Sequence, residues 1–285
     1  AAQAFAFAAR LEVDLAESQG VGRAELLSGA SVHTRIAIEL FERAGQRTPQ
    51  LEPLWVSGRI ERARGDWRDA ELAFERCADL ARRVLSVEYE LHALMGLIGL
   101  ARDRGDIHAV DRLLGRAALV TTPEAFWPLA REHAVLLLHT DRAPEALEFL
   151  ERCRPQQGHW LAEWHALRGS THQRLGDLVS ARAAVAALED LAQGELATLL
   201  RASIDLASGD PRAVIDALGV PLAQGSYSIL GNAQGASLFG EACLELGEYD
   251  AASLWLEEAL ARAGGWAALQ ADPAPGSVFG EWIGL

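Results

Sequence analysis

The stretch RARGDWRDAELAF, residues 62–74, decides how this chain is built, because its outline returns four more times. The later copies are RDRGDIHAVDRLL at 102–114, QRLGDLVSARAAV at 173–185, LASGDPRAVIDAL at 206–218 and LELGEYDAASLWL at 244–256. Apolar residues recur at helical spacing on both sides of each Gly-Asp or Gly-Glu pair, which predicts helix, tight turn, helix. Glycine supplies the left-handed backbone with which helices commonly end, and the aspartate that follows can cap the next helix.

The turn positions recur every 33 to 40 residues, a period typical of helical solenoids. They are Gly65, Gly105, Asp141, Gly176, Gly209 and Gly247. Some five positions after the turn, a small residue would let paired helices approach closely; these residues are Ala70, Ala146, Ala181 and Ala252. Four positions further, a large residue would fill the space between repeats; these residues are Phe74, Leu150, Val185 and Leu256.

This pattern resembles the tetratricopeptide repeat, which places a small residue before its turn, an aromatic soon after it, then Ala, a large apolar residue and a final Ala. Gly58, Trp67, Ala70 and Phe74 match that order, with Cys77 in place of the final alanine. The C-terminal copy matches through Gly240, Tyr249, Ala252, Leu256 and Ala259.

Three parts of the chain depart from the family's pattern. Ile98 stands where a small residue belongs, and Pro221 occupies the place of a final alanine. Near the start, residues 4–18 predict a first helix and residues 33–45 a second, so that residues 20–30 between them are interpreted as an insertion able to hold a short helix of its own.

The resemblance implies an all-α, right-handed helical-repeat solenoid of about seven antiparallel helix pairs. We expect it to run over residues 1–265 as one domain, without a second globular domain. Residues 266–285 are rich in Gly and Pro. They are interpreted either as a cap over the exposed apolar end of the solenoid or as a linker to another domain.

Composition narrows the classes of partner and compartment. The formal charge is −14, and all 26 basic residues are Arg, a bias typical of GC-rich bacterial genomes. Nucleic acids need a basic surface, so we expect neither nucleic acid nor an anionic membrane as partner. Three widely spaced cysteines fit a reducing cytoplasm rather than a disulfide framework, and no apolar run approaches the ~18 residues of a membrane span. The start lacks Met and a signal peptide, so we expect the chain to begin inside a longer protein.

The sequence offers no catalytic constellation. P-loop, GxGxxG, HExxH and GxSxG motifs are absent. His165 and His172 share a helix face but lack a third ligand at matching spacing. Cys77 and Cys153 fall at the buried final position of the repeat. We therefore expect no enzyme activity, no cofactor and no metal site.

Binding on the concave face is the functional expectation. In this family the first helix of each pair lines that face, with positions about ten, six and three residues before the turn pointing outward. The candidate partner-binding residues, at or beside those positions, are Trp55, Arg59, Arg62, His92, Arg102, Arg131, Gln173 and Arg174. Because Arg forks suit carboxylates, an acidic protein or peptide is the expected partner.

The resemblance favours a protein–protein interaction scaffold or sensor segment of a larger bacterial protein, as in the irregular repeat regions of large bacterial regulators. Two alternatives stay open. One is a small-molecule-sensing domain of a transcriptional regulator, and the other is the regulatory arm of a protease.

Overall fold

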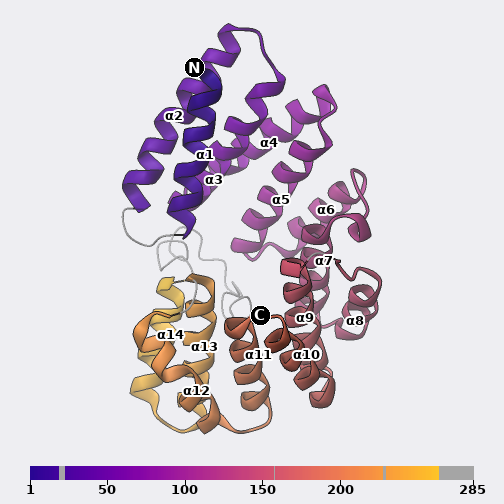
Figure 1. Ribbon diagram of the computed structural model, residues 1–285, viewed down its shortest axis with the longest axis vertical. Coiled ribbons are helices and arrows are strands. Elements are labelled where there is room, and N and C mark those ends of the chain that lie inside the picture. Colours follow the sequence, from indigo (N-terminus) through magenta and orange to yellow (C-terminus); the bar gives the residue numbers. More distant parts are fainter. Residues whose placement is uncertain (19–22, 157, 227–228, 263–285) are drawn as a thin grey trace. The chain divides into compact units, whose positions relative to one another are not determined.

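The computed structural model describes residues 1–18, 23–156, 158–226 and 229–262 (Figure 1). Within these ranges the chain forms fourteen α-helices and two single-turn 3-10 helices, η1 (Thr48–Gln50) and η2 (Pro123–Ala125), without a β-strand. The fourteen α-helices are α1 (Ala2–Ser18), α2 (Arg23–Arg43), α3 (Leu51–Arg64), α4 (Trp67–Val84), α5 (Val87–Asp103), α6 (Ile107–Ala118), α7 (Trp127–His139), α8 (Ala143–Arg152), α9 (Gly158–Arg174), α10 (Leu178–Asp190), α11 (Gly194–Ala207), α12 (Pro211–Gln224), α13 (Ile229–Glu245) and α14 (Tyr249–Arg262).

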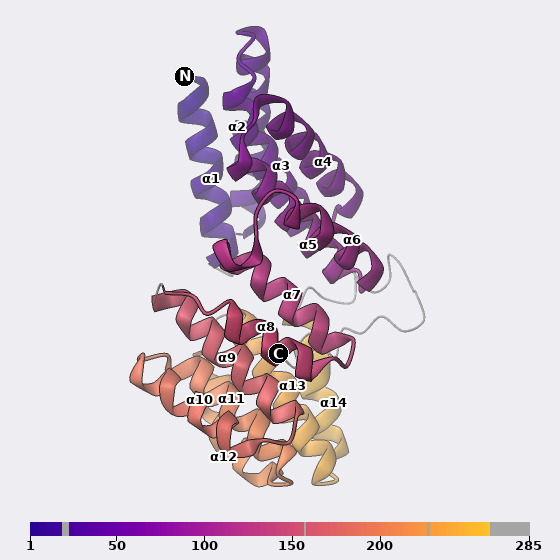
Figure 2. The ribbon, with the colours of Figure 1, turned by 90° about the vertical axis from the view of Figure 1, so that its right-hand side faces the viewer.

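The helices pack sequentially in seven pairs, from α1 with α2 to α13 with α14 (Figures 1 and 2). Contacts divide the chain into two compact units: unit 1, Ala1–Thr122, holds α1 to α6, and unit 2, Pro123–Leu285, holds α7 to α14. The all-α repeat architecture predicted from the sequence is confirmed. The single domain over residues 1–265 stays a prediction.

All six predicted turns adopt the left-handed backbone that the glycine pattern required. The φ angles are 84° at Gly65, 70° at Gly105, 57° at Asp141, 76° at Gly176, 76° at Gly209 and 77° at Gly247. The aspartate after the glycine caps the next helix in three pairs: Asp106, Asp177 and Asp210 accept hydrogen bonds from backbone N–H groups of Ala109, Ser180 and Ala213 at 2.8, 3.1 and 3.2 Å. Local sequence therefore sets both the end of one helix and the start of its partner.

After each turn, a small residue followed by a large one forms the packing contact between helices. Ala70, Ala146 and Ala181 are wholly buried, and Ala252 nearly so. In unit 1, the ring of Phe74 lies between two glycines of different pairs, since a Cβ added to Gly58 of α3 or to Gly96 of α5 would lie only 2.5 Å from it. Phe74 thus connects the second pair to the third.

The interpretation of residues 20–30 as an insertion with its own helix is wrong. Helix α2 begins at Arg23 and continues without a break to Arg43. The helical period extends backwards, because Leu27 and Ala30 are buried in the same cluster as Ala9 and Val13 of α1. Gly29 is accommodated inside the helix, where its missing side chain leaves space for the Glu12 carboxylate.

The C-terminal segment predicted as a cap or linker, residues 266–285, lies outside the described residues. In the part of the chain that is described, no helix is both long and apolar enough to cross a lipid bilayer.

Candidate functional site

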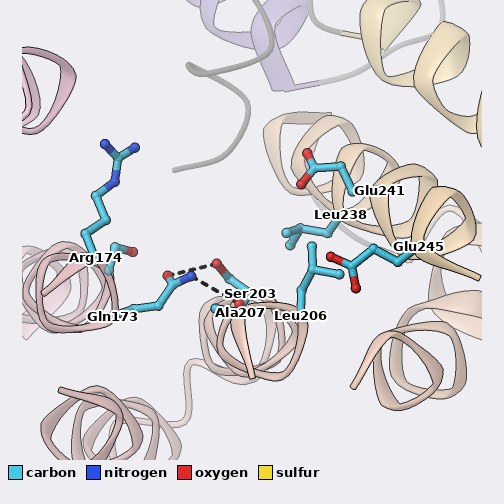
Figure 3. Close-up of a pocket in the computed structure, with 9 residues that line it drawn as sticks. Gln173, Arg174, Ser203, Leu206, Ala207, Leu238, Glu241 and Glu245 are labelled. Carbon is cyan, nitrogen blue, oxygen red and sulfur yellow. Dashed lines mark hydrogen bonds between the residues drawn. The ribbon is translucent and has the colours of Figure 1, made fainter. Parts of the chain in front are cut away.

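A cleft of about 340 Å³ opens in unit 2 on the first helices of the last three pairs, α9, α11 and α13 (Figure 3). These helices are neighbours, α11 contacting both α9 and α13. Nine residues line the cleft: Ser170, Gln173, Arg174, Ser203, Leu206, Ala207, Leu238, Glu241 and Glu245. The cleft therefore spans three successive repeats rather than lying within one.

The floor of the cleft is fixed by a side-chain bridge and two leucines. The Gln173 amide donates to the Ser203 carbonyl at 3.1 Å and accepts from the Ser203 hydroxyl at 2.9 Å. This pair of bonds ties α9 to α11 and orients the amide. Leu206 from α11 and Leu238 from α13 supply the apolar part of the surface (Figure 3).

Opposite charges face the cleft from its two outer helices. Arg174 extends from the end of α9, while the Glu241 and Glu245 carboxylates extend from α13 toward the same space (Figure 3). Arg174 donates from Nη1 to the Leu138 carbonyl at 3.0 Å, which anchors the guanidinium and, among the described residues, engages one of its five N–H donors. No carboxylate of the described residues pairs with Arg174.

The Glu241 carboxylate is held at some electrostatic cost. Loss of hydration at the cleft wall raises the pKa of the Glu241 carboxyl, although its side chain remains open to solvent. The Ser237 hydroxyl, which donates to Glu241 at 3.1 Å, opposes this pKa shift, and the Glu245 charge adds to it. A cation brought into the cleft would relieve the repulsion between these two carboxylates.

The charges occupy equivalent places in the repeat. Arg174, Ala207 and Glu245 each lie two residues before the left-handed glycine that ends the first helix of the pair. Ala207, at the middle place, lines the cleft with a short uncharged side chain. A cation, a small uncharged residue and an anion thus occupy the same place in three successive repeats.

The predicted partner-binding residues of unit 1 contact side chains of neighbouring helices, and their role in binding stays a prediction. Trp55 of α3 stacks on His92 of α5, with ring centroids 5.1 Å apart and planes at 25°. The Arg59 guanidinium lies over the Trp55 ring at 4.8 Å and pairs with Asp14 of α1 at 2.8 Å. Burial lowers the pKa of His92, so that it is neutral in this stack.

Arg62 and Arg102 share one carboxylate in unit 1. Arg62 donates from Nε to Asp103 at 2.7 Å, and Arg102 Nε lies 3.8 Å from the same carboxylate. The Arg62 guanidinium reaches Asp103 by passing over Gly99, where an added Cβ would lie 2.6 Å from it. Arg62 therefore joins α3 to α5, while Arg102 contacts the same carboxylate from within α5.

Arg131, in unit 2, is also engaged. It pairs with the buried Glu132 at 2.7 Å and with Glu163 of α9 at 3.6 Å. Glu163 in turn accepts from the Trp127 indole N–H at 2.9 Å. Arg59, Arg62, Arg102 and Arg131 thus each contact a carboxylate of this chain. Of the eight predicted residues, Gln173 and Arg174 line the cleft on α9, α11 and α13.

The repeat pattern identified the lining face but not the choice of residues on it. Ser170, Ser203, Leu206 and Glu241 lie six or three residues before their turns, as expected for the exposed positions of first helices. The sequence prediction weighted cations on this face, so these residues were not among its candidates. The equivalent place of Arg174 in the next pairs was the signal that could have found Ala207 and Glu245.

The described residues hold no group of three or more His, Cys, Asp or Glu side chains that could bind a metal ion. All three cysteines are buried free thiols. Burial raises the pKa of Cys77 to about 12, so this thiol stays protonated and unreactive at neutral pH. Its Sγ contacts the Leu51 carbonyl at 3.4 Å, as expected for a residue that replaces alanine in the core.

Comparison with known proteins agrees on the fold. No protein-family model and no curated protein sequence matches the chain. Among solved structures, a tetratricopeptide repeat protein from Parabacteroides merdae is similar over 99% of this chain and 98% of its own, with a TM-score of 0.61 and 13% identity. At that identity the likeness establishes a tetratricopeptide-like repeat fold and no particular partner.

Proposed function

We propose that this chain is a protein-interaction scaffold that binds a segment of a partner protein on the first-helix face of unit 2. The observation that carries the proposal is the cleft on α9, α11 and α13, which occupies the positions where this repeat pattern exposes side chains. The tetratricopeptide-like fold supports it, because such repeats typically serve as interaction scaffolds.

The proposal moves the binding centre away from the arginines of unit 1. Arg59 and Arg62 each already hold a carboxylate of a neighbouring helix, and an incoming acidic segment would have to displace it. In the cleft, by contrast, neither Arg174 nor the two glutamates have an ion-pair partner among the described residues (Figure 3). Polar contacts with a partner would there be added without breaking existing ion pairs.

The test fills the cleft. A random 12-residue peptide library displayed on phage is selected against the parent protein, and the enriched peptides are titrated by fluorescence anisotropy against Ala207→Trp. Ala207 is an exposed residue at the end of α11, so an indole there would occupy the cleft while leaving the core unchanged. The expected result is at least about a tenfold loss of affinity.

Val179→Trp is the matched control, because Val179 is an exposed residue on α10, the second helix of its pair. It should bind the selected peptides like the parent. Circular dichroism melting confirms that both variants are folded. Peptides that bind Ala207→Trp as tightly as the parent, or a library in which nothing enriches, would show that the cleft is not a peptide-binding site.

A further inference from the structure

We infer that the segment bound in the cleft is dipolar, with a basic side chain over α13 and an acidic group over α9. This inference rests on the function proposed above and names the chemistry of the ligand. It follows from the placement of Arg174 on one wall and of Glu241 with Glu245 on the other (Figure 3).

The wall on α13 is built for a cation. Glu241 and Glu245 are one helical turn apart on the same face of α13, and neither has a basic partner among the described residues. An ammonium or guanidinium group between them would pair with both carboxylates and remove the repulsion that each imposes on the other. Because the net charge of the protein is −14, the electrostatic field around it also attracts a basic side chain.

The wall on α9 is built for an anion. The bond from Arg174 to the Leu138 carbonyl holds the guanidinium in place, and its other N–H groups have no carboxylate partner among the described residues. Leu138 lies in α7, so the anchor comes from a different helix than the cleft itself. An acidic group is attracted to this wall alone, since the opposite wall repels it.

The distance between the walls selects a chain segment over a small zwitterion. Neighbouring helices pack roughly 8–10 Å apart, so the axes of α9 and α13, with α11 between them, are separated by roughly 16–20 Å. In a free amino acid the ammonium and carboxylate are joined through one carbon and cannot reach both walls. In an extended peptide, at about 3.3 Å per residue, charges about two to four residues apart can do so, while the residues between them contact Leu206 and Leu238.

The experiment exchanges the charges of the two cleft walls. Synthetic fluorescent peptides carry one basic and one acidic residue separated by one, two or three alanines, in both orders along the chain, with blocked termini. They are titrated against the parent, Arg174→Glu, Glu245→Arg and the double variant. In the parent one order should bind more tightly, and each single reversal should reduce that affinity about tenfold. The double variant should instead prefer the opposite order.

The double variant Arg212→Glu with Glu257→Arg is the matched control. Both residues are exposed and lie on second helices, α12 and α14, and the net charge is unchanged, as in the exchange of the walls. It should keep the order preference of the parent. Raising the salt concentration should weaken the preferred peptide more than an uncharged one, because the charges are exposed.

Two results would overturn the inference in distinguishable ways. If peptides lose affinity for Ala207→Trp but respond to neither single reversal, the cleft binds peptides without reading their charges, and the proposed function stands alone. If the dipolar peptides bind Ala207→Trp like the parent, they do not use the cleft, and both proposals fail.

Discussion

Two sets of first helices use their exposed side chains in opposite ways, α3 and α5 in unit 1 and α9 and α13 in unit 2. In unit 1, α3 and α5 are joined across their exposed face by the Trp55–His92 stack and the Arg62–Asp103 pair. In unit 2, α9 and α13 keep Arg174 and Glu245 apart on the two sides of a cleft. The difference shows that charged side chains at the surface of one repeat can form ion pairs with a neighbouring helix pair. In another repeat, charged side chains at the surface form no such pair and can contact a partner.

The largest expected effect tests how strongly the pairs of unit 1 depend on one another. Phe74→Ala removes a ring that is almost fully buried against Gly58 and Gly96. We expect it to lower the free energy of unfolding by about 3–5 kcal/mol, measured by urea denaturation. Leu72→Ala, at an exposed position on the same helix, is the control and should cost about 0.5 kcal/mol or less. Equal effects of the two variants would mean that Phe74 does not connect the pairs.

A smaller effect separates structural charges from available ones. Asp103→Asn leaves Arg62 and Arg102 without their shared carboxylate and should cost about 1–2 kcal/mol, since the pair is only partly shielded from solvent. Glu241→Gln should leave stability unchanged or slightly raised, because the native state disfavours the charged form of a carboxyl whose pKa is raised. Thermal melting of both variants at neutral pH tests this, and a loss in Glu241→Gln as large as that in Asp103→Asn would remove the contrast between the units.

The smallest expected effect is on how the free energy of unfolding changes as the pH is lowered. Burial holds the pKa of His92 below 6.5 in the native state, so the unfolded chain takes up its proton first as the pH falls. The stability that neutral His92 contributes is complete well above pH 6.5 and is lost as the pH falls through 6.5 toward the lower native pKa. Between about pH 7.5 and 5.5, His92→Gln should therefore lose less stability than the parent, by about 1 kcal/mol or less.

Unfolding midpoints measured across that pH range in parent and variant test this expectation. His108→Gln, at an exposed position on α6, is the control and should follow the parent. A parallel pH dependence in His92→Gln and the parent would show that the stacked imidazole is not kept neutral by the fold.

The repeat could be predicted from sequence because its signals are local. A left-handed glycine, a capping aspartate and an alanine where helices cross act within a few residues of one another, and Gly65, Asp106 and Ala70 each adopt the role that the pattern assigned. The start of α2 was missed because Ser28 and Gly29 are typical of loops. Only the burial of Leu27 and Ala30 against α1, a contact distant in sequence, makes that segment helical.

The candidate site could be predicted only as a face. Whether an arginine on that face is already paired depends on residues 41 positions away for Arg62 and 45 for Arg59. These ion pairs depend on how successive helix pairs stack against one another, and a single sequence does not show that stacking. The same limit explains why Glu245 was missed: only the stacking of repeats brings it to the same cleft as Arg174, two repeats earlier.

The placement of Phe74 also bears on how such a chain can be lengthened or shortened by recombination. One ring closes against glycines of two successive pairs, so inserting or deleting a pair at the junction of α4 and α5 would part it from Gly96. The new neighbour would then leave either a void or a clash, each costing about 1–5 kcal/mol. Duplication of whole pairs is therefore tolerated at this junction only when the incoming first helix carries a glycine in the matching place, and the number of repeats is constrained by single residues at their joints.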